Sequence, residues 1–260
     1  MPRGALAVSG PWPAELVLVR HGESVGNVAD AAAQKAHADR LTLDYRDADT
    51  PLSEAGERQA DAVGEHLAAR GSDTPDVIVT SPYERAAQTA ARAVRGWGHR
   101  QEVIADERLR ERDLGLFDGM TGSGIRAEYA DEAKRRAWVG KFYYRPPSGE
   151  SWCDVALRVR SLLVDLRAGY ADQRVWLFTH QAVIMAFRYV LENLTEQELL
   201  EIDRTRDLPN CSITTYKGTA HGLELVSFAD PAVVSDSAAP QTTEPSRSSE
   251  GSSEGSDGDR

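Results

Sequence analysis

Cysteine is scarce in this sequence, which contains only Cys153 and Cys211 among its 260 residues. Two cysteines are too few for a disulfide framework, and neither has a Cys or His neighbour at zinc-finger spacing. We therefore expect both to be packing residues in a chain that works in the reducing cytoplasm.

Long hydrophobic runs and an excess of positive charge are also missing. The longest uncharged run, VWLFTHQAVIMAF, is shorter than a bilayer-spanning helix, and ALAV near the start is too short for the core of a signal peptide. The chain has 30 Lys and Arg residues against 41 Asp and Glu, a formal net charge of −11. We expect no membrane and no nucleic-acid partner, so a phosphate ligand would need a local cluster of arginines.

The composition changes at both ends of the chain. Residues 1–13, with two glycines and two prolines after residue 3, predict a flexible leader. Residues 231–260 are mostly Ser, Ala, Pro, Gly, Thr and acids, with two valines as the only large aliphatic residues, and predict a disordered acidic tail. Residues 14–230 are long and apolar enough to form one domain.

Strand-like and helix-like segments alternate within this domain. Short β-rich runs predict strands at ELVLVR, DVIVT, RVWLFT, SITTY and LELVSF. The segment LSEAGERQADAVGEHLAARG predicts an amphipathic helix with Ser53 as N-cap and an end at Gly71. This alternation predicts an α/β fold with helices on both faces of the sheet, in which ligands bind at the carboxyl ends of the strands.

Cationic and imidazole side chains follow three of the predicted strands. The first strand ends in Arg20 and His21, and the strand RVWLFT is followed by His180. DVIVT leads into SPYERAAQTA, where Ser81 and Pro82 predict a helix start that places Arg85 about one turn into the helix. Two histidines and two arginines therefore converge on one predicted pocket.

The motifs around these residues resemble the histidine phosphatases, the phosphoglycerate mutase-like superfamily. RHGES with Asn27, LSEAGERQA, TSPYERAAQTA, RLRERDLGLFDG, SGES and FTHQAVI occur in the family's order between Glu15 and Ser227. A lone Arg-His-Gly would be weak evidence, but six separated motifs in order are specific. The resemblance implies a three-layer α/β/α fold with a mostly parallel, mixed central sheet and a helical insertion over the pocket.

The resemblance also implies a role for each matching residue. His21 would be the nucleophile that takes up the phosphoryl group, and Glu111 would be the proton donor, with Glu107 and Asp113 as nearby alternatives. The phosphate pocket and its substrate contacts would come from Arg20, Asn27, Arg85, His180 and Gln181, and Arg20, Arg85 and His180 also count as catalytic. No metal and no cofactor is implied, and the partner is a small phosphorylated substrate.

The chemistry of these side chains fits phosphoryl transfer on its own terms. Guanidinium groups stay charged at all working pH values and offer a fixed fork of donors to phosphate oxygens. A unit charge pair at 4 Å is worth roughly 4 kcal/mol at an effective dielectric constant of 20, so two arginines offset much of the cost of desolvating a phosphate. The same cations disfavour protonation of His21 and keep its lone pair available.

Two departures from the mutase branch of the family favour hydrolysis. This chain has ERDLG where the mutases typically have ERHYG, and HQA where they have Gly-Asn after the second histidine; HQAV is more similar to the fructose-2,6-bisphosphatase branch. We therefore predict a metal-independent phosphomonoesterase that forms a phosphohistidine. The alternatives are a phosphoglycerate mutase-type isomerase and a non-catalytic phosphate-binding module.

The segment 118–148 matches the family's insertion over the pocket. Its cations could meet further anionic groups of a substrate, and its aromatic residues could pack a ring or close a small hydrophobic core; packing and solvation are the commoner use of such side chains. The sequence indicates neither a particular substrate nor an oligomeric state.

Overall fold

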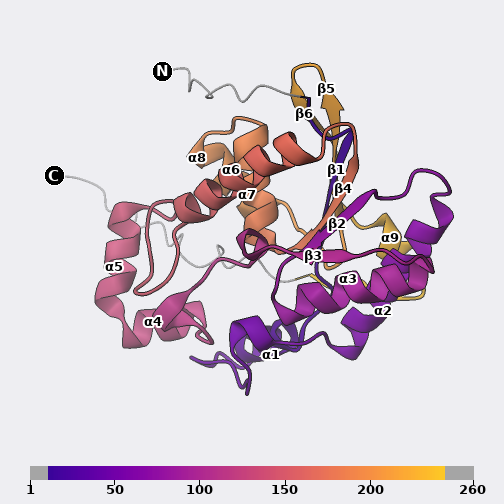
Figure 1. Cartoon of the computed structure of the whole chain (residues 1–260). Coiled ribbons are helices and arrows are strands. Elements are labelled where there is room, and N and C mark those ends of the chain that lie inside the picture. The colour runs from indigo at the N-terminus through magenta and orange to yellow at the C-terminus, as the bar shows by residue number, and fades with distance from the viewer. Residues whose placement is uncertain (1–10, 244–260) are drawn as a thin grey trace.

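The central sheet forms from the short apolar runs that predict strands. The computed structural model describes residues 11–243, which form a six-stranded sheet in the order β3-β2-β4-β1-β5-β6 (Figure 1). The strands are β1 (Glu15–Arg20), β2 (Val77–Thr80), β3 (Val103–Ala105), β4 (Arg174–Thr179), β5 (Ile213–Thr219) and β6 (Gly222–Asp230).

The four strands β1 to β4 are parallel, and the β5–β6 hairpin continues the sheet in the antiparallel sense. In the register of the central pair, Arg20 lies opposite Thr179, so the residues that follow these two strands emerge at one edge. This edge is the carboxyl end of the parallel strands, where α/β folds bind ligands. The structure confirms the predicted mostly parallel, mixed sheet.

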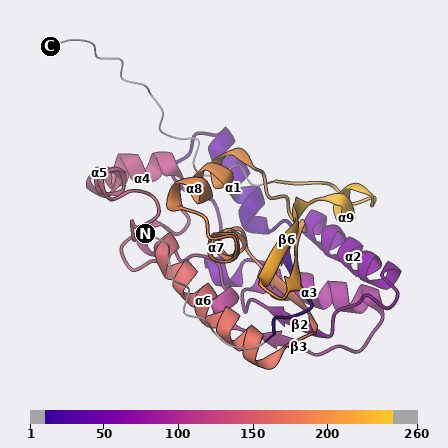
Figure 2. The ribbon, with the colours of Figure 1, turned by 90° about the horizontal axis from the view of Figure 1, so that it is seen from above.

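Helices cover both faces of the sheet and so complete the predicted three-layer α/β/α architecture (Figure 2). Successive strand residues point to opposite faces, so Val17 and Val19 pack with one helical layer while Leu16 and Leu18 pack with the other. The first layer contains α2 (Glu54–Ala69), α3 (Glu84–Trp97) and α9 (Ala232–Ser235), and the second contains α6 (Trp152–Gly169), α7 (Gln181–Leu191) and α8 (Glu196–Thr205).

The predicted helix starts are right in one case and wrong in another. Ser53 caps α2 as predicted, since its hydroxyl accepts a hydrogen bond from Gly56 N at 3.0 Å. Ser81 does not cap α3, because two residues after it are still in a turn and the helix begins at Glu84. The Ser81 hydroxyl instead accepts from Tyr83 N at 3.1 Å, which tightens that turn and still leaves Arg85 in the first turn of α3.

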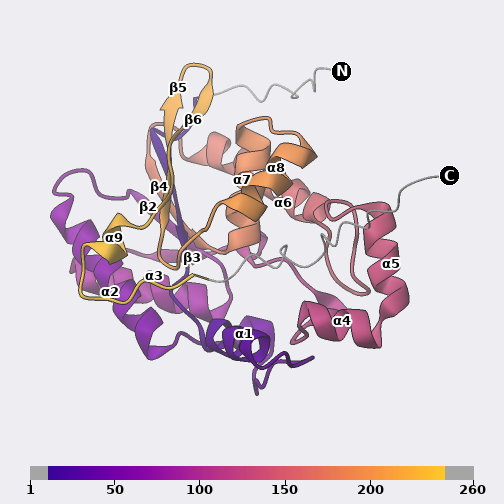
Figure 3. The same cartoon turned by 180° about the vertical axis from the view of Figure 1, so that it is seen from behind.

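The segment 118–148 lies beside the sheet layers as two short helices, α4 (Gly122–Glu128) and α5 (Ala130–Val139) (Figure 3). Phe117, Met120 and Tyr144 close a small hydrophobic core beside these helices, so of the two uses expected for the aromatic residues of this segment, Tyr144 has the packing one. Trp138 on α5 is 88% exposed and takes no part in that core. Helix α1 (Val25–Lys35) and the 3₁₀ turns at Asp47–Asp49, Glu107–Leu109 and Gly115–Phe117 complete the described elements.

The predicted limits of the leader and the tail need correction. Trp12 packs against the core and Pro13 is buried, so order begins before residue 14. In the tail, α9 buries Val234 completely, and Gln59 Nε2 donates to the Pro240 carbonyl at 2.7 Å. Low apolar content predicts a disordered tail, but hydrogen bonds to the buried Gln59 side chain order this polar segment. The rest of the predicted leader and tail, residues 1–10 and 244–260, lies outside the described residues.

Both cysteines are free thiols, with Cys211 buried and Cys153 packed against the core, in agreement with the packing role that we expect. Burial raises the pKa of the Cys211 thiol well above its ordinary value. Within residues 11–243, none of the helices has the length and apolarity needed to cross a bilayer.

Candidate active site

His21 follows the last residue of β1 and is held at the strand edge by its backbone. Its N–H donates to Thr179 O at 2.9 Å, and its ring Nδ1 lies 2.7 Å from Gly22 O. A carbonyl oxygen can only accept, so Nδ1 carries the proton and Nε2 keeps its lone pair. The ring is only 3% exposed. This tautomer leaves Nε2 as the ring atom that carries the lone pair.

The loop after His21 is pressed against the start of α2. A Cβ on Gly22 would lie 2.6 Å from Gly56 O, and a Cβ on Gly56 would lie 1.9 Å from Glu23 O, so both positions require glycine. Gly22 N also donates to the Thr89 hydroxyl on α3 at 3.0 Å. The motif LSEAGERQA contains Gly56 but does not reveal this role, because a close backbone approach between two segments is visible only in three dimensions.

Arg85 lies directly beside Nε2 of His21. Its Nε donates to His21 Nε2 at 3.3 Å, and its guanidinium is paired with Asp47, with 3.1 Å between Nη1 and Oδ1. The arginine side chain is only 6% exposed, whereas that of Asp47 is 39% exposed. The guanidinium therefore holds a carboxylate at the place where its donors would meet the oxygens of a phosphate.

His180 is completely buried next to His21, with 5.0 Å between the ring centroids. Its Nε2 lies 2.8 Å from the Ser81 hydroxyl, while Nδ1 has no hydrogen-bond partner among the described residues. Tyr83 contacts the same imidazole edge-on at 5.4 Å, and burial raises the pKa of this phenol to about 12. Tyr83 therefore keeps its proton at any working pH.

Burial and the neighbouring guanidinium groups keep both imidazoles neutral. The pKa of His21 is lowered well below its ordinary value by burial first, and then by the charges of Arg85 and Arg20. Burial also lowers the pKa of His180, followed by the charges of Arg85 and of His21 if it were protonated. Because desolvation and a nearby positive charge both disfavour the imidazolium, the two rings are neutral bases at neutral pH.

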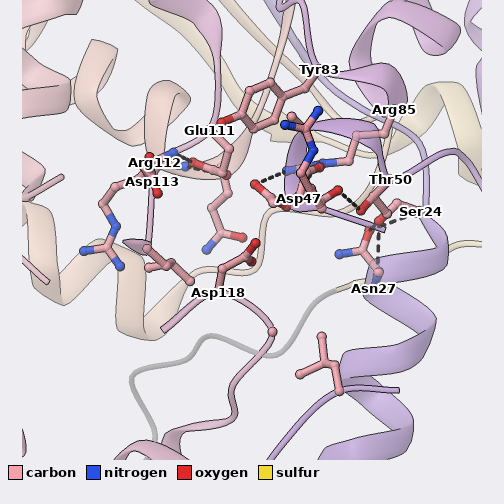
Figure 4. A pocket seen from close by; sticks show the side chains of 18 of the residues that line it. Ser24, Asn27, Asp47, Thr50, Tyr83, Arg85, Glu111, Arg112, Asp113 and Asp118 are labelled. Atoms are coloured by element: carbon pink, nitrogen blue, oxygen red, sulfur yellow. Dashed lines mark hydrogen bonds and ion pairs between the residues drawn. The ribbon is translucent and has the colours of Figure 1, made fainter. Parts of the chain in front are cut away.

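Asn27 has a defined orientation. Its Oδ1 accepts from Ser24 N at 3.0 Å and from Ser24 Oγ at 3.1 Å, and Asn210 Nδ2 approaches the same oxygen at 3.5 Å. With donors gathered around the oxygen, the amide nitrogen is turned to the pocket side, as Figure 4 shows. Asn27 thus presents a donor, which fits its predicted contact with a phosphate oxygen.

Arg20 lies behind the pocket wall. It is 1% exposed and donates from Nη1 to the carbonyl of Leu208. Neither Arg20 nor His180 is among the side chains that line the open pocket, although both act on His21 through charge or ring contact.

Glu111 lines the pocket on the opposite side from Asn27 (Figure 4). Its segment is fixed against the sheet, since Thr179 Oγ1 donates to Leu109 O at 2.8 Å and Arg158 Nη2 donates to Glu111 O at 3.3 Å. Its carboxylate accepts from Arg112 N at 2.6 Å and lies 3.5 Å from Ala182 N at the start of α7.

Three acids lie near Glu111 in the sequence, and two of them, Asp113 and Asp118, line the same pocket. Asp113 lines it and Glu107 does not, which separates the two alternatives that the sequence left open. Asp118 also lines it, and the sequence does not predict this, since Asp118 begins an insertion whose path the sequence does not fix. Burial, and then the charge of Asp47, raise the pKa of Asp118, which favours the protonated form that a proton donor needs.

Gln181 begins α7 and lines the pocket together with Asp203 and Lys141. Its Nε2 lies 3.4 Å from Asp203 Oδ1, and Lys141 Nζ pairs with Asp203 Oδ2 at 2.7 Å. Among the cations of the segment 118–148, Arg136 and Lys141 line the pocket. The Arg145 guanidinium pairs with Asp154.

The pocket has a volume of about 470 Å³, which is enough for a phosphorylated metabolite. Five of the seven predicted site residues line it: His21, Asn27, Arg85, Glu111 and Gln181. No group of three His, Cys, Asp or Glu side chains suited to a metal ion occurs within residues 11–243. The fold and site define an α/β protein whose pocket, at the carboxyl edge of a parallel sheet, places a neutral histidine next to the guanidinium of Arg85.

The chain belongs to the histidine phosphatase superfamily, whose branch 1 family model matches residues 16–231. A 2,3-bisphosphoglycerate-dependent phosphoglycerate mutase of Methylobacterium radiotolerans is 35% identical over 197 residues, which are 75% of this chain and 86% of the mutase. The solved structure of a mycobacterial glucosyl-3-phosphoglycerate phosphatase with VO3 is 31% identical, with a TM-score of 0.66 over 84% of this chain and 100% of the phosphatase.

The same phosphatase has also been solved with inorganic phosphate, at 30% identity and a TM-score of 0.65 over 85% of this chain and 99% of the phosphatase. These comparisons confirm the family that the motifs resemble. Phosphatases and mutases both occur among the relatives of this chain, so the family leaves two reactions open.

Proposed function

We propose that this protein is a metal-independent phosphomonoesterase that hydrolyses small phosphorylated metabolites through a phosphohistidine at His21. The observation that carries the proposal is the state of His21, which is a buried, neutral imidazole. Its Nδ1 donates a hydrogen bond to Gly22 O, and its Nε2 lies 3.3 Å from Nε of Arg85. A nucleophile with a lowered pKa next to a phosphate-binding cation is the arrangement that phosphoryl transfer needs.

In the first step, the Nε2 lone pair of His21 attacks phosphorus and the P–O bond of the ester breaks. A proton from an acid in the pocket, for which Glu111 is our proposal, goes to the departing alkoxide oxygen. Arg85 and the donor of Asn27 would stabilise the charge on the phosphoryl oxygens. In the second step, a water oxygen attacks phosphorus, the P–N bond breaks, and the same carboxylate takes the proton of the water.

The unpartnered nitrogen of His180 supports a bound phosphate. If Nε2 accepts the Ser81 proton, Nδ1 carries a proton that has no acceptor among the described residues. Leaving a buried donor unsatisfied costs about 1–3 kcal/mol. An oxygen of a phosphoryl group on His21, whose ring centroid is 5.0 Å away, would supply the acceptor.

Hydrolysis is favoured over isomerisation by the ERDLG and HQA motifs and by the phosphatase among the structural neighbours. The second candidate is a phosphoglycerate mutase-type isomerase, which the 35% identical mutase favours. A cytoplasmic location and a small-molecule partner belong to the same proposal.

The test is a phosphate-release assay on a panel of phosphomonoesters in EDTA, with the phosphoglycerate mutase reaction run alongside. We expect release without added metal and little isomerisation. Rapid quenching with ³²P-labelled substrate should trap an acid-labile, alkali-stable phosphoenzyme in the wild type and none in His21→Ala. Turnover that requires a divalent ion, or label that survives in His21→Ala, would refute the mechanism; dominant isomerisation would support the mutase.

A further inference from the structure

The backbone carbonyl of His21 is held by a segment near the end of the described chain. It accepts from Asn210 Nδ2 at 3.1 Å and from Cys211 N at 3.3 Å. Cys211 has a left-handed backbone, with φ of 56°, which a residue with a side chain adopts at a cost. The strained backbone of Cys211 brings both donors to the His21 carbonyl. Such a conformation persists only where neighbouring contacts hold it, so other residues must fix Asn210.

Thr242 holds Asn210 from the other side. The Thr242 hydroxyl donates to Asn210 Oδ1 at 3.1 Å, and Asn210 N donates to Thr242 O at 3.0 Å. Asn210 is 1% exposed, so water does not replace these bonds. Because the hydroxyl fixes the oxygen of the amide, the nitrogen must point at His21 O.

The same hydroxyl also fixes Gln59. Gln59 Nε2 donates to Thr242 Oγ1 at 2.8 Å, and Gln59 Oε1 accepts from Glu23 N at 2.8 Å. Gln59 is fully buried on α2. The Thr242 hydroxyl therefore accepts one hydrogen bond from Gln59 and donates one to Asn210. These two side-chain amides in turn bond the backbone at Glu23 and at His21, on either side of Gly22.

We propose that Thr242 is a positioning residue for the nucleophile: its hydroxyl, acting through Asn210 and Gln59, fixes the loop that aims His21 Nε2 at phosphorus. The inference rests on the proposed role of His21 in phosphoryl transfer. Asn210 also approaches Asn27 Oδ1 at 3.5 Å, so the same network reaches a second predicted phosphate contact. The segment 240–242 thereby has a function at the site although its sequence is polar and low in complexity.

The test compares Thr242→Val, which removes the hydroxyl at nearly constant shape, with Thr242→Ser, which keeps it. Thr243→Val is the matched control, because Thr243 is exposed and next in the chain. A small misplacement of a reacting group costs roughly 10- to 100-fold in rate, so we expect kcat of Thr242→Val to fall by about tenfold with KM changed less than about twofold. Thr242→Ser and Thr243→Val should stay within about twofold of wild type.

A readout that does not depend on turnover is the proton NMR resonance of the His21 Nδ1–H that faces Gly22 O, assigned by its loss in His21→Ala. It should shift in Thr242→Val and stay in place in Thr243→Val. An unchanged resonance with unchanged kcat would overturn the proposal, and so would an equal loss of kcat in Thr242→Ser. If the wild type hydrolyses no ester, the proposed function fails, while the resonance still decides whether Thr242 positions His21.

Discussion

Arg85 donates its Nε–H to Nε2 of His21 across 3.3 Å, so the atom that we propose as nucleophile faces a fixed positive charge. The contact explains two properties at once. It helps to lower the pKa of His21, and it places a planar fork of donors at the point where phosphoryl oxygens would gather.

The first prediction concerns the planar arrangement of N–H donors on the Arg85 guanidinium. Arg85→Lys keeps a positive charge but removes the planar donors, and losing one such preorganised donor typically costs about 10²- to 10³-fold in kcat. We expect a loss of at least about 10²-fold in kcat/KM for phosphate esters. Arg92→Lys is the control, since Arg92 lies on the same helix α3 and pairs with Glu57 and Asp61 away from the pocket. An Arg85→Lys enzyme within a fewfold of wild type would show that charge alone suffices.

The second prediction concerns Asp47, whose carboxylate pairs with the guanidinium of Arg85. A phosphate must compete with this carboxylate for the guanidinium and is repelled by its charge. Asp47→Asn should therefore bind inorganic phosphate several-fold more tightly, as measured by titration calorimetry. Asp61→Asn is the control, because Asp61 pairs with Arg92 away from the pocket. Weaker binding in Asp47→Asn would show that the carboxylate mainly orients Arg85.

The third prediction follows from the neutral histidines. Unfolded histidine has a pKa of about 6.5, while burial lowers the pKa of His21 and of His180 in the folded protein. Below pH 6.5 the unfolded chain therefore binds more protons than the folded one, so stability is complete above this pH and falls as the solution is acidified. Each histidine contributes about 1.4 kcal/mol per pH unit in this window.

Urea unfolding at pH 7.5, 6.0 and 5.0 measures this slope. His21→Asn should have a shallower slope than wild type between pH 6.5 and 5.0, because one of the two groups no longer titrates. The acid limb of kcat/KM should likewise lie below pH 6.5, where the free enzyme still holds His21 unprotonated. A wild-type stability that rises on acidification through this range would contradict neutral, buried histidines.

The sequence predicts the fold and the centre of the site because both depend on local patterns. Apolar runs of strand length alternate with an amphipathic, capped helix, and parallel strands bring their carboxyl ends to one edge. His21, Arg85 and His180 each follow a different strand, so the topology alone makes them converge. The family motifs add Asn27 and Glu111, which local patterns would not have selected.

What the sequence does not predict depends on partners that are distant along the chain. Gln59 and Thr242 are 183 residues apart in the sequence, and the segment around Thr242 has no apolar periodicity to mark it as ordered. Asp47 and Asp118 reach the pocket from loops whose paths are set by tertiary contacts. Ser-Pro predicts a helix cap at Ser81, but the Ser81 hydroxyl bonds Tyr83 N within a turn, and α3 begins only at Glu84.

The last prediction identifies the proton donor by the leaving group that it serves. An alkoxide leaves a phosphate ester only with a proton, and a positioned acid contributes roughly 10²- to 10⁴-fold in rate, whereas nitrophenolate leaves well without one. Glu111→Gln should therefore slow hydrolysis of a sugar or glycerol phosphate severely and spare p-nitrophenyl phosphate to a much greater extent. Glu107→Gln is the control outside the pocket and should show no such difference between substrates.

Asp113→Asn and Asp118→Asn complete the series, because both side chains line the pocket with Glu111. Asp118 is a specific rival, since burial and the nearby charge of Asp47 raise its pKa and so favour its protonated form. If the difference between the two substrates appears in Asp118→Asn and not in Glu111→Gln, the acid is Asp118. Equal losses on both substrates in Glu111→Gln would mean that Glu111, which accepts from Arg112 N and approaches Ala182 N, shapes the pocket wall instead of donating the proton.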